Sequence, residues 1–248
     1  MRDEITARLL RLNKQFYQNF AQHFAETRRR LQPGVPRILD QLPPQVSVLD
    51  LGCGNGELAI GLARRGHNGV YLGLDASGVL LSIACQKCEH PQARFQLANL
   101  ADPAWVETLP APSQGEIKRS YDRILAFAVL HHLPGRSLRL DLVGQVHDLL
   151  ADDGQFILSN WNFMVSPRLQ ARVVPWEAIG LSQEEVEPGD YLLDWRRGGI
   201  GLRYVHHFNE EELQNLATEA GYQVVETFYS DGEGGRLGLY QVWEKRGK

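Results

Sequence analysis

The feature of this chain that most constrains its fold is a glycine-rich segment near residue 50. Residues 46–51 form a largely apolar run, which is typical of a buried strand, and Gly52, Gly54 and Gly56 follow with single residues between them. Residues 57–65 then have the pattern of a helix. Glycine allows a sharp turn and brings the backbone close to a ligand. Strand, glycine turn and helix in this order indicate the nucleotide-binding arrangement of α/β proteins.

An acidic residue, Asp50, stands just before the first of these glycines. The spacing G-x-G-x-G also differs from the G-x-G-x-x-G of dinucleotide-binding loops. A carboxylate here would repel a pyrophosphate at the helix N-terminus, but it suits a ligand that carries an ammonium group. S-adenosylmethionine carries one on its methionine end, so the loop indicates this molecule as a candidate ligand.

Strands and helices alternate through the following hundred residues. The predicted strands are 46–51, 69–74, 94–97, 123–127 and 155–160. The predicted helices lie near 57–65, 78–89 and 136–150, and a turn at 152–154 closes the last of them. Strands separated by helices of this length are typical of parallel βαβ units.

Both ends of the chain add elements to this core. Apolar residues recur every three or four positions near the N-terminus, which predicts one amphipathic helix; they are Ile5, Leu9, Leu12, Phe16, Phe20 and Phe24. Asn209 with Glu212 has the form of a capping box, and Gly221 that of a stop signal, for a helix between them. Residues 222–229 and 237–244, joined by a glycine-rich turn, predict a β-hairpin.

These elements predict one α/β domain over residues 1–248. We expect a Rossmann-like, seven-stranded and mostly parallel sheet with an antiparallel C-terminal hairpin and helices on both faces. Residues 1–40 are expected to form an N-terminal helical cap. Residues 162–205 break the alternation with three prolines and a glycine pair, and we expect an inserted cap over the ligand site.

Composition limits the classes of function. The chain has 248 residues, 43% of them hydrophobic and 23% charged, with a net charge of −4, so no global basic field attracts nucleic acid. Residues 1–40 hold eight Lys/Arg against four acids, which fits either a local basic patch or a solvated helix face. Three cysteines and the lack of a long apolar run predict a cytoplasmic protein without a disulfide framework or a membrane segment.

Polar residues follow the predicted strands at their carboxyl ends, where open α/β sheets bind ligands. Asp75 ends the second strand, where an acid would hydrogen-bond two ribose hydroxyls. Asn99 follows the third strand and could contact an adenine edge, and residues 127–132 follow the fourth, next to the reacting centre. Each acid could instead be a helix cap, but four positions in register favour a ligand site.

Three segments resemble motifs of class I S-adenosylmethionine-dependent methyltransferases: VLDLGCGNG at 48–56, GLDAS at 73–77 and AFAVLHH at 126–132. The resemblance implies S-adenosylmethionine as cofactor. It also implies donor contacts from Asp50, Gly52, Cys53, Gly54, Asn55, Gly56, Asp75, Ala76, Ser77, Asn99, Leu100, Phe127 and Ala128. Tyr17 and Phe24 of the N-terminal helix are expected to close over the donor, although core packing explains them equally well.

A second resemblance reaches outside the donor site. FYQNFAQHFAETR at 16–28, Gly189-Asp190, Trp195 and RYVHHF at 203–208 are similar to segments of the tRNA wobble-uridine methyltransferases, which esterify 5-carboxymethyluridine. The family's Pro-Trp pair after Thr-Arg is absent here, and Asn99 stands where an Asp is common. Some members of that family work with a small zinc-ribbon partner. The resemblance implies tRNA as the substrate.

The acceptor determines which residues would be catalytic. A carboxylate is ionised at pH 7 and needs a cation rather than a base, which Arg28 or Arg203 would supply by a charge-assisted hydrogen bond. For an amine or hydroxyl acceptor, His131, His132 or His206 becomes a candidate base, unless the two adjacent histidines only shape their loop. Trp161 and Trp195 could stack on a splayed base.

Three functions therefore stay open: a tRNA carboxymethyluridine methyltransferase, a small-molecule O- or N-methyltransferase, and a donor-binding subunit that needs a zinc-ribbon activator. No metal site is predicted in this chain. Cys85, Cys88 and His90 resemble half a zinc site, but a second cysteine pair is missing and i, i+3 cysteines are ordinary helix neighbours.

Overall fold

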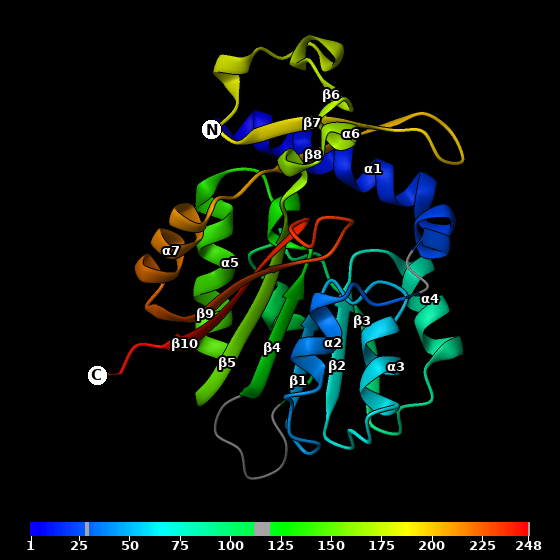
Figure 1. Cartoon of the computed structure of the whole chain (residues 1–248), viewed down its shortest axis with the longest axis vertical. Helices are drawn as coiled ribbons and strands as arrows, with labels where there is room; N and C mark the ends of the chain where they lie inside the picture. Colours follow the sequence, from blue (N-terminus) through cyan, green and yellow to red (C-terminus); the bar gives the residue numbers. More distant parts are fainter. Residues whose placement is uncertain (28–29, 112–119, 248) are drawn as a thin grey trace.

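The computed structural model describes residues 1–27, 30–111 and 120–247, without the side chains of residues 24, 25 and 27. A seven-stranded sheet forms its centre (Figure 1), with the strand order β3-β2-β1-β4-β5-β10-β9. The first five strands are β1 (Val48–Leu51), β2 (Tyr71–Asp75), β3 (Ala93–Leu97), β4 (Tyr121–Phe127) and β5 (Leu150–Trp161). They run parallel, whereas β10 (Gly238–Lys245) is antiparallel to both β5 and β9 (Tyr222–Ser230). The predicted Rossmann-like sheet with its C-terminal hairpin is confirmed.

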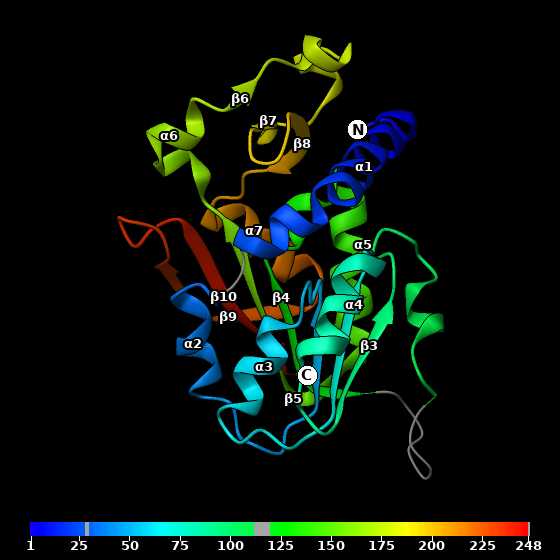
Figure 2. The ribbon, with the colours of Figure 1, turned by 90° about the vertical axis from the view of Figure 1, so that its right-hand side faces the viewer.

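Helices cover both faces of the large sheet (Figure 2). On one face, α2 (Gly34–Leu39) and α3 (Glu57–Ala63) pack against β1, β5 and β10, and α4 (Gly78–Lys87) lies against β2 and β3. On the other face, α5 (Arg136–Leu149) and α7 (Glu210–Glu219) enclose the largest apolar core. Short 3-10 turns fill the connections: Trp105–Thr108, Leu130–His132 (η2), Phe163–Val165, Trp176–Ile179 and Gln183–Glu185.

A second, smaller sheet is built by the region that the sequence marks as an insertion. It consists of β6 (Val173–Val174), β7 (Asp190–Trp195) and β8 (Gly201–His206), all antiparallel, with α6 (Pro167–Gln170) beside it. The long helix α1 (Asp3–Thr27) packs on this sheet through Ile5 and Leu9, which meet Leu192 and Tyr204. Both lie above the carboxyl ends of the parallel strands (Figure 1). Within residues 1–40, α1 thus accompanies the small sheet, while α2 belongs to the core of the large one.

Two local predictions need correction. The turn expected at residues 152–154 lies inside β5: Tyr121 pairs with Leu150 but Arg123 pairs with Gln155, so the residues between bulge from the strand. The predicted capping box is half formed. Asn209 Oδ1 accepts a hydrogen bond from the Glu212 backbone N–H at 2.8 Å. The Glu212 carboxylate contacts His206 of β8 instead of the Asn209 backbone N–H.

None of the described helices is both long enough and apolar enough to cross a membrane.

Candidate active site

The glycine loop after β1 has the shape that its sequence predicts. Gly52, Gly54 and Gly56 all have positive φ angles, +74°, +56° and +80°, which residues other than glycine rarely adopt. A Cβ on Gly52 would lie 2.7 Å from Cγ2 of Val129, and one on Gly56 would lie 2.9 Å from Cβ of Ala84. Around Gly54, in contrast, no described atom beyond the glycine itself and its two chain neighbours comes within 4 Å of that position. The loop is therefore closely packed behind and open at Gly54, where a ligand can approach the backbone.

Asp75, at the carboxyl end of β2, joins this loop to the start of α4. Its Oδ2 accepts a hydrogen bond from the Gly54 N–H at 2.9 Å, and its Oδ1 accepts one from the Ser77 N–H at 2.8 Å. Burial raises the pKa of the carboxyl, and these backbone bonds oppose the increase. Each carboxylate oxygen has further lone pairs for ribose hydroxyls. The arrangement fits the adenosine part of S-adenosylmethionine.

Asp50 lies beneath the loop and is 3% exposed. The Tyr71 hydroxyl donates a hydrogen bond to its Oδ2 at 2.5 Å. Burial raises the pKa of Asp50 to about 7, against the effect of the Tyr71 bond. The sequence points to Asp50 but not to Tyr71, because nothing in the pattern distinguishes a core tyrosine of β2 from one that binds a carboxylate. A contact between Asp50 and the donor ammonium group stays a prediction.

The other predicted donor residues lie close to this loop in the fold. Cys53 and Asn55 are buried within it, and Ala76 follows Asp75 directly. Asn99 is exposed after β3, and its Oδ1 accepts the Ala101 N–H at 3.3 Å; Leu100 is its chain neighbour. Their contacts with the donor stay predictions.

The chain bends sharply after β4, at the end of Phe127. Ala128 has a φ of +60°, an uncommon conformation for a residue with a side chain. Its N–H donates to the Ser159 carbonyl at 2.9 Å, and lies 3.2 Å from the Ser159 hydroxyl. Backbone held in such a conformation concentrates at functional sites. The bend positions η2, and with it both adjacent histidines, at the carboxyl edge of the sheet.

α1 is attached to η2 by specific hydrogen bonds. The Tyr17 hydroxyl and Nε2 of His132 are 2.7 Å apart. Asn13 Nδ2 donates to the carbonyls of His132 and Tyr204, at 3.2 and 3.1 Å. The neighbouring His131 is 2% exposed, and its Nδ1 accepts the Trp161 N–H at 3.3 Å. The structure thus brings Tyr17 to the loop after β4, and its closure over the donor stays a prediction. Phe24 has no described side chain, and Arg28 lies outside the described residues.

Arg203 of β8 is a buried cation in an aromatic environment. It is 7% exposed, and its guanidinium carbon lies 4.7 Å from the ring centroid of Trp161, 5.5 Å from that of Phe16 and 5.7 Å from that of Trp195. Aromatic rings stabilise a cation through their π faces, and low local polarity strengthens its attraction for an anion. Trp161 is the last residue of β5, so this cluster lies at the carboxyl edge of the sheet.

His206 of β8 lies between two carboxylates rather than among aromatic rings. Its Nδ1 lies 2.7 Å from Oδ1 of Asp190 and its Nε2 lies 2.8 Å from Oε1 of Glu212. Burial opposes the charged ring, but the two carboxylates outweigh burial and raise the pKa of His206. Because both ring nitrogens donate to carboxylates, no nitrogen lone pair is left to take a proton. This geometry argues against the predicted role of His206 as a base.

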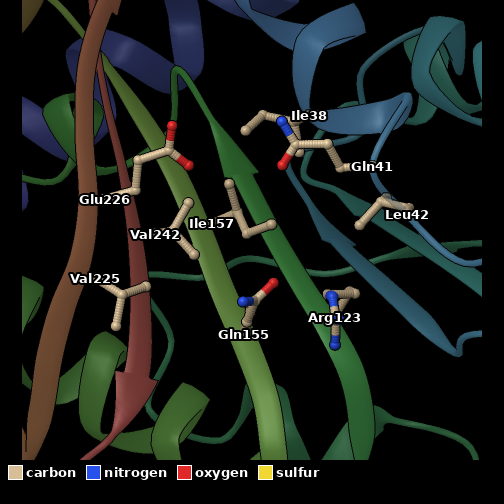
Figure 3. A pocket seen from close by; sticks show the side chains of 9 residues that line it. All are labelled: Ile38, Gln41, Leu42, Arg123, Gln155, Ile157, Val225, Glu226 and Val242. Carbon is tan, nitrogen blue, oxygen red and sulfur yellow. The ribbon is translucent and has the colours of Figure 1, made fainter.

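The cysteine pair and a separate hollow lie away from these residues. Cys85 is exposed on α4 and Cys88 follows the helix, while Nε2 of His90 lies 2.8 Å from Nδ1 of His67. A hollow of about 420 Å³ lies on the sheet face beside α2 (Figure 3). Its lining includes none of the predicted site residues: Ile38, Gln41, Leu42, Arg123, Gln155, Ile157, Val225, Glu226 and Val242.

Comparison with known proteins identifies the class. Residues 21–227 match the family described as methyltransferase domain, and the chain belongs to this family. Its fold resembles that of an S-adenosylmethionine-dependent methyltransferase from Methanosarcina mazei, with a TM-score of 0.63 and 20% identity, over 86% of this chain and 98% of the other. A 1,6-didemethyltoxoflavin-N1-methyltransferase from Burkholderia thailandensis gives a TM-score of 0.65 and 18% identity, over 100% and 92%.

The family and fold confirm the enzyme class that the sequence predicts, a methyltransferase that takes its methyl group from S-adenosylmethionine. Among relatives, a putative methyltransferase of Encephalitozoon cuniculi is 27% identical, over 85% of this chain and 87% of its own. A tRNA (carboxymethyluridine(34)-5-O)-methyltransferase of Schizosaccharomyces pombe is 26% identical, over 87% and 90%. The enzyme of that name from Saccharomyces cerevisiae is 28% identical, over 58% and 46%.

Proposed function

We propose that this chain methylates the carboxylate of 5-carboxymethyluridine at the wobble position of tRNA. The observation that carries the proposal is Arg203, a guanidinium buried among aromatic rings at the carboxyl edge of the sheet. Such a group fits an acceptor that is both anionic and attached to a flat base. The similarity to the Schizosaccharomyces pombe enzyme extends over most of both chains, which supports the same acceptor.

Transfer from a sulfonium is an in-line displacement, so catalysis depends mainly on positioning. S-adenosylmethionine supplies an electrophilic methyl group when bound. Gly54 and Asp75 would hold its adenosine part, while Tyr17 would cover the site from α1. In the proposed arrangement the Arg203 guanidinium donates to one oxygen of the acceptor carboxylate, and the other oxygen attacks. The acceptor has no proton to lose at pH 7, which agrees with a His206 ring that cannot accept one.

The ring cluster also supports a second candidate, a small aromatic carboxylate as acceptor. A buried guanidinium among aromatic rings would suit a flat anionic acceptor whether or not a polynucleotide is attached to it. A chain that binds donor yet transfers to neither acceptor would favour the third expectation, a subunit that requires a zinc-ribbon activator.

Replacing Arg203 tests the proposal. Arg203→Met keeps the length and apolar part of the side chain but removes the charge. We expect turnover of carboxymethyluridine tRNA to fall about 10²–10³-fold, as for the loss of one preorganised donor, with donor binding in calorimetry unchanged. Arg203→Lys should recover part of the activity because the charge remains.

The matched control is Arg123→Met, which removes a half-buried arginine beside the hollow of Figure 3. It should leave turnover within about twofold of wild type, since Arg123 lies near the start of β4, away from the carboxyl edge of the sheet. Equal turnover in Arg203→Met and wild type, with matching thermal stability, would remove Arg203 from the acceptor site.

A further inference from the structure

The connection between β7 and β8 forms an exposed tip of unusual composition. Residues 196–200 read Arg-Arg-Gly-Gly-Ile and are all exposed, and the Ile200 side chain is 89% exposed. The hairpin extends past α6, above the C-terminal half of α1 (Figure 1). An isoleucine presented to solvent next to two arginines is not explained by packing of this chain.

The tip is held against α1. Gly198 and Gly199 have positive φ angles of +71° and +141°, and a Cβ on Gly198 would lie 2.1 Å from Cδ2 of His23. A Cβ on Gly199 would lie 3.0 Å from Cε1 of Phe20. A side chain at Gly198 or Gly199 would meet α1, so the two glycines let the backbone of the tip lie close to the helix. Arg197 and Ile200 are thus presented from a supported hairpin.

The tip is continuous with the proposed acceptor site. Its base is Trp195, which pairs with Gly201 across the hairpin and packs against the Phe16 ring at 5.6 Å. Ile200 precedes Arg203 by three residues, which spans about 10 Å in a strand. A nucleotide next to the acceptor nucleotide could therefore reach the tip.

The tip carries two exposed arginines, Arg196 and Arg197, which suit an anionic polymer, and two acids lie beside it, Asp194 and, on α1, Glu26. Arg196 Nε donates to Oδ2 of Asp194 at 2.6 Å, which orients the guanidinium while its side chain stays 71% exposed. On α1, His23 faces Glu26 at 3.7 Å. Arginine binds phosphate oxygens in a fixed fork geometry, and apolar side chains insert beside unstacked bases. One isoleucine is too little apolar surface for a bilayer, so RNA is favoured over a membrane.

We propose that this tip binds the single-stranded RNA that flanks the acceptor nucleotide. Arg196 and Arg197 neutralise two phosphates, and Ile200 packs against a neighbouring unstacked base. The inference rests on the proposed function for the identity of the acceptor, and it adds a contact surface on the small sheet. The tip thereby favours a nucleotide within an RNA loop over a free nucleoside.

The test measures RNA binding and methyl transfer separately. Binding of a labelled, unmodified anticodon stem-loop RNA is measured between about 50 and 200 mM salt, where phosphate contacts dominate the salt dependence. The variant R196Q/R197Q should lower the slope of log affinity against log salt by about 1.4, at about 0.7 per phosphate of a single strand. I200S should weaken binding several-fold without changing the slope.

The control variants are R64Q/K87Q and V70S, which change exposed residues at the opposite edge of the sheet and should match wild type. In the transfer assay R196Q/R197Q should raise KM for carboxymethyluridine tRNA about tenfold, with kcat retained. A salt slope equal to that of wild type would overturn the tip proposal, whether or not the wild type transfers methyl to tRNA. Tip-dependent RNA binding without methyl transfer would instead overturn the proposed function and leave the tip as an RNA-binding element.

Discussion

The buried charge cluster around His206 gives the sharpest prediction about stability. The ring bridges Asp190 of β7 and Glu212 of α7, and therefore connects the small sheet to a helix of the large one. Tyr204 also donates to Asp190 at 2.6 Å, and Arg139 of α5 pairs with Glu187 at 2.9 Å. The Arg139 guanidinium reaches Glu212 as well, at 3.8 Å.

The variant His206→Leu keeps the apolar volume but leaves two carboxylates without their common donor. His206 is 1% exposed, so removing one partner of this buried ion cluster should cost about 3–5 kcal/mol of the free energy of unfolding. For a chain of this length each kcal/mol lowers Tm by about 2–4 °C. Tm should therefore fall by roughly 6–20 °C.

The stabilisation by His206 should also depend on pH, in a direction that its pKa determines. The pKa of His206 is raised above its ordinary value by the two carboxylates. The stabilisation is therefore fully present below about pH 6.5, the pKa of an unfolded histidine, and is lost as pH rises through the folded pKa. The difference in unfolding free energy between wild type and His206→Leu should be larger at pH 6 than at pH 9.

Urea unfolding at these two pH values measures that difference. The control His23→Leu removes a side chain that is 43% exposed, in a surface pair with Glu26, and should change stability by about 1 kcal/mol or less. A difference for His206→Leu that is below 1 kcal/mol, or that grows from pH 6 to pH 9, would refute the assignment of His206 as a charged bridge.

Three further predictions concern the donor site and the thiols. Gly56→Ala should weaken S-adenosylmethionine binding in calorimetry by at least tenfold and lower Tm, because φ is +80° and the new Cβ meets Ala84; wild-type binding would contradict this account of the loop. Asp75→Asn should weaken donor binding without lowering Tm by more than a few degrees, and unchanged affinity would exclude the ribose contact. In native protein, a thiol reagent should modify exposed Cys85 much faster than Cys53. Cys53 is 7% exposed, and burial and nearby acids raise the pKa of its thiol. Rapid modification of Cys53 in the variant Cys85→Ser would show that the glycine loop opens.

Local patterns predicted the large sheet because each of its parts has a local cause. The glycine loop requires positive φ angles at Gly52 and Gly56, and the apolar runs before and after it are long enough to mark buried strands. The predicted turn at 152–154 failed because the β-bulge depends on pairing with β4, which a local turn signal does not encode. The small sheet was expected only as a cap, since its strands are short and prolines interrupt the region.

Part of the candidate site was predictable because some of its residues also follow local sequence patterns. Asp75 follows a recognisable strand, and its bonds to the glycine loop follow from adjacent parallel strands. The ring cluster around Arg203 joins α1, β5, β7 and β8, and contacts at such sequence separation leave no local pattern. The two carboxylates that engage His206 come from β7 and α7, so the sequence could suggest a base but not exclude one.

The most direct test of the central claim is transfer of labelled methyl from S-adenosylmethionine to tRNA that contains 5-carboxymethyluridine. Nucleoside mass spectrometry identifies the product, and mild alkali distinguishes an ester from an ether or an N-methyl group, because only the ester releases labelled methanol. We predict the alkali-labile methyl ester at the wobble uridine. An alkali-stable methyl group, or transfer to a small carboxylate but not to tRNA, would contradict the proposed acceptor.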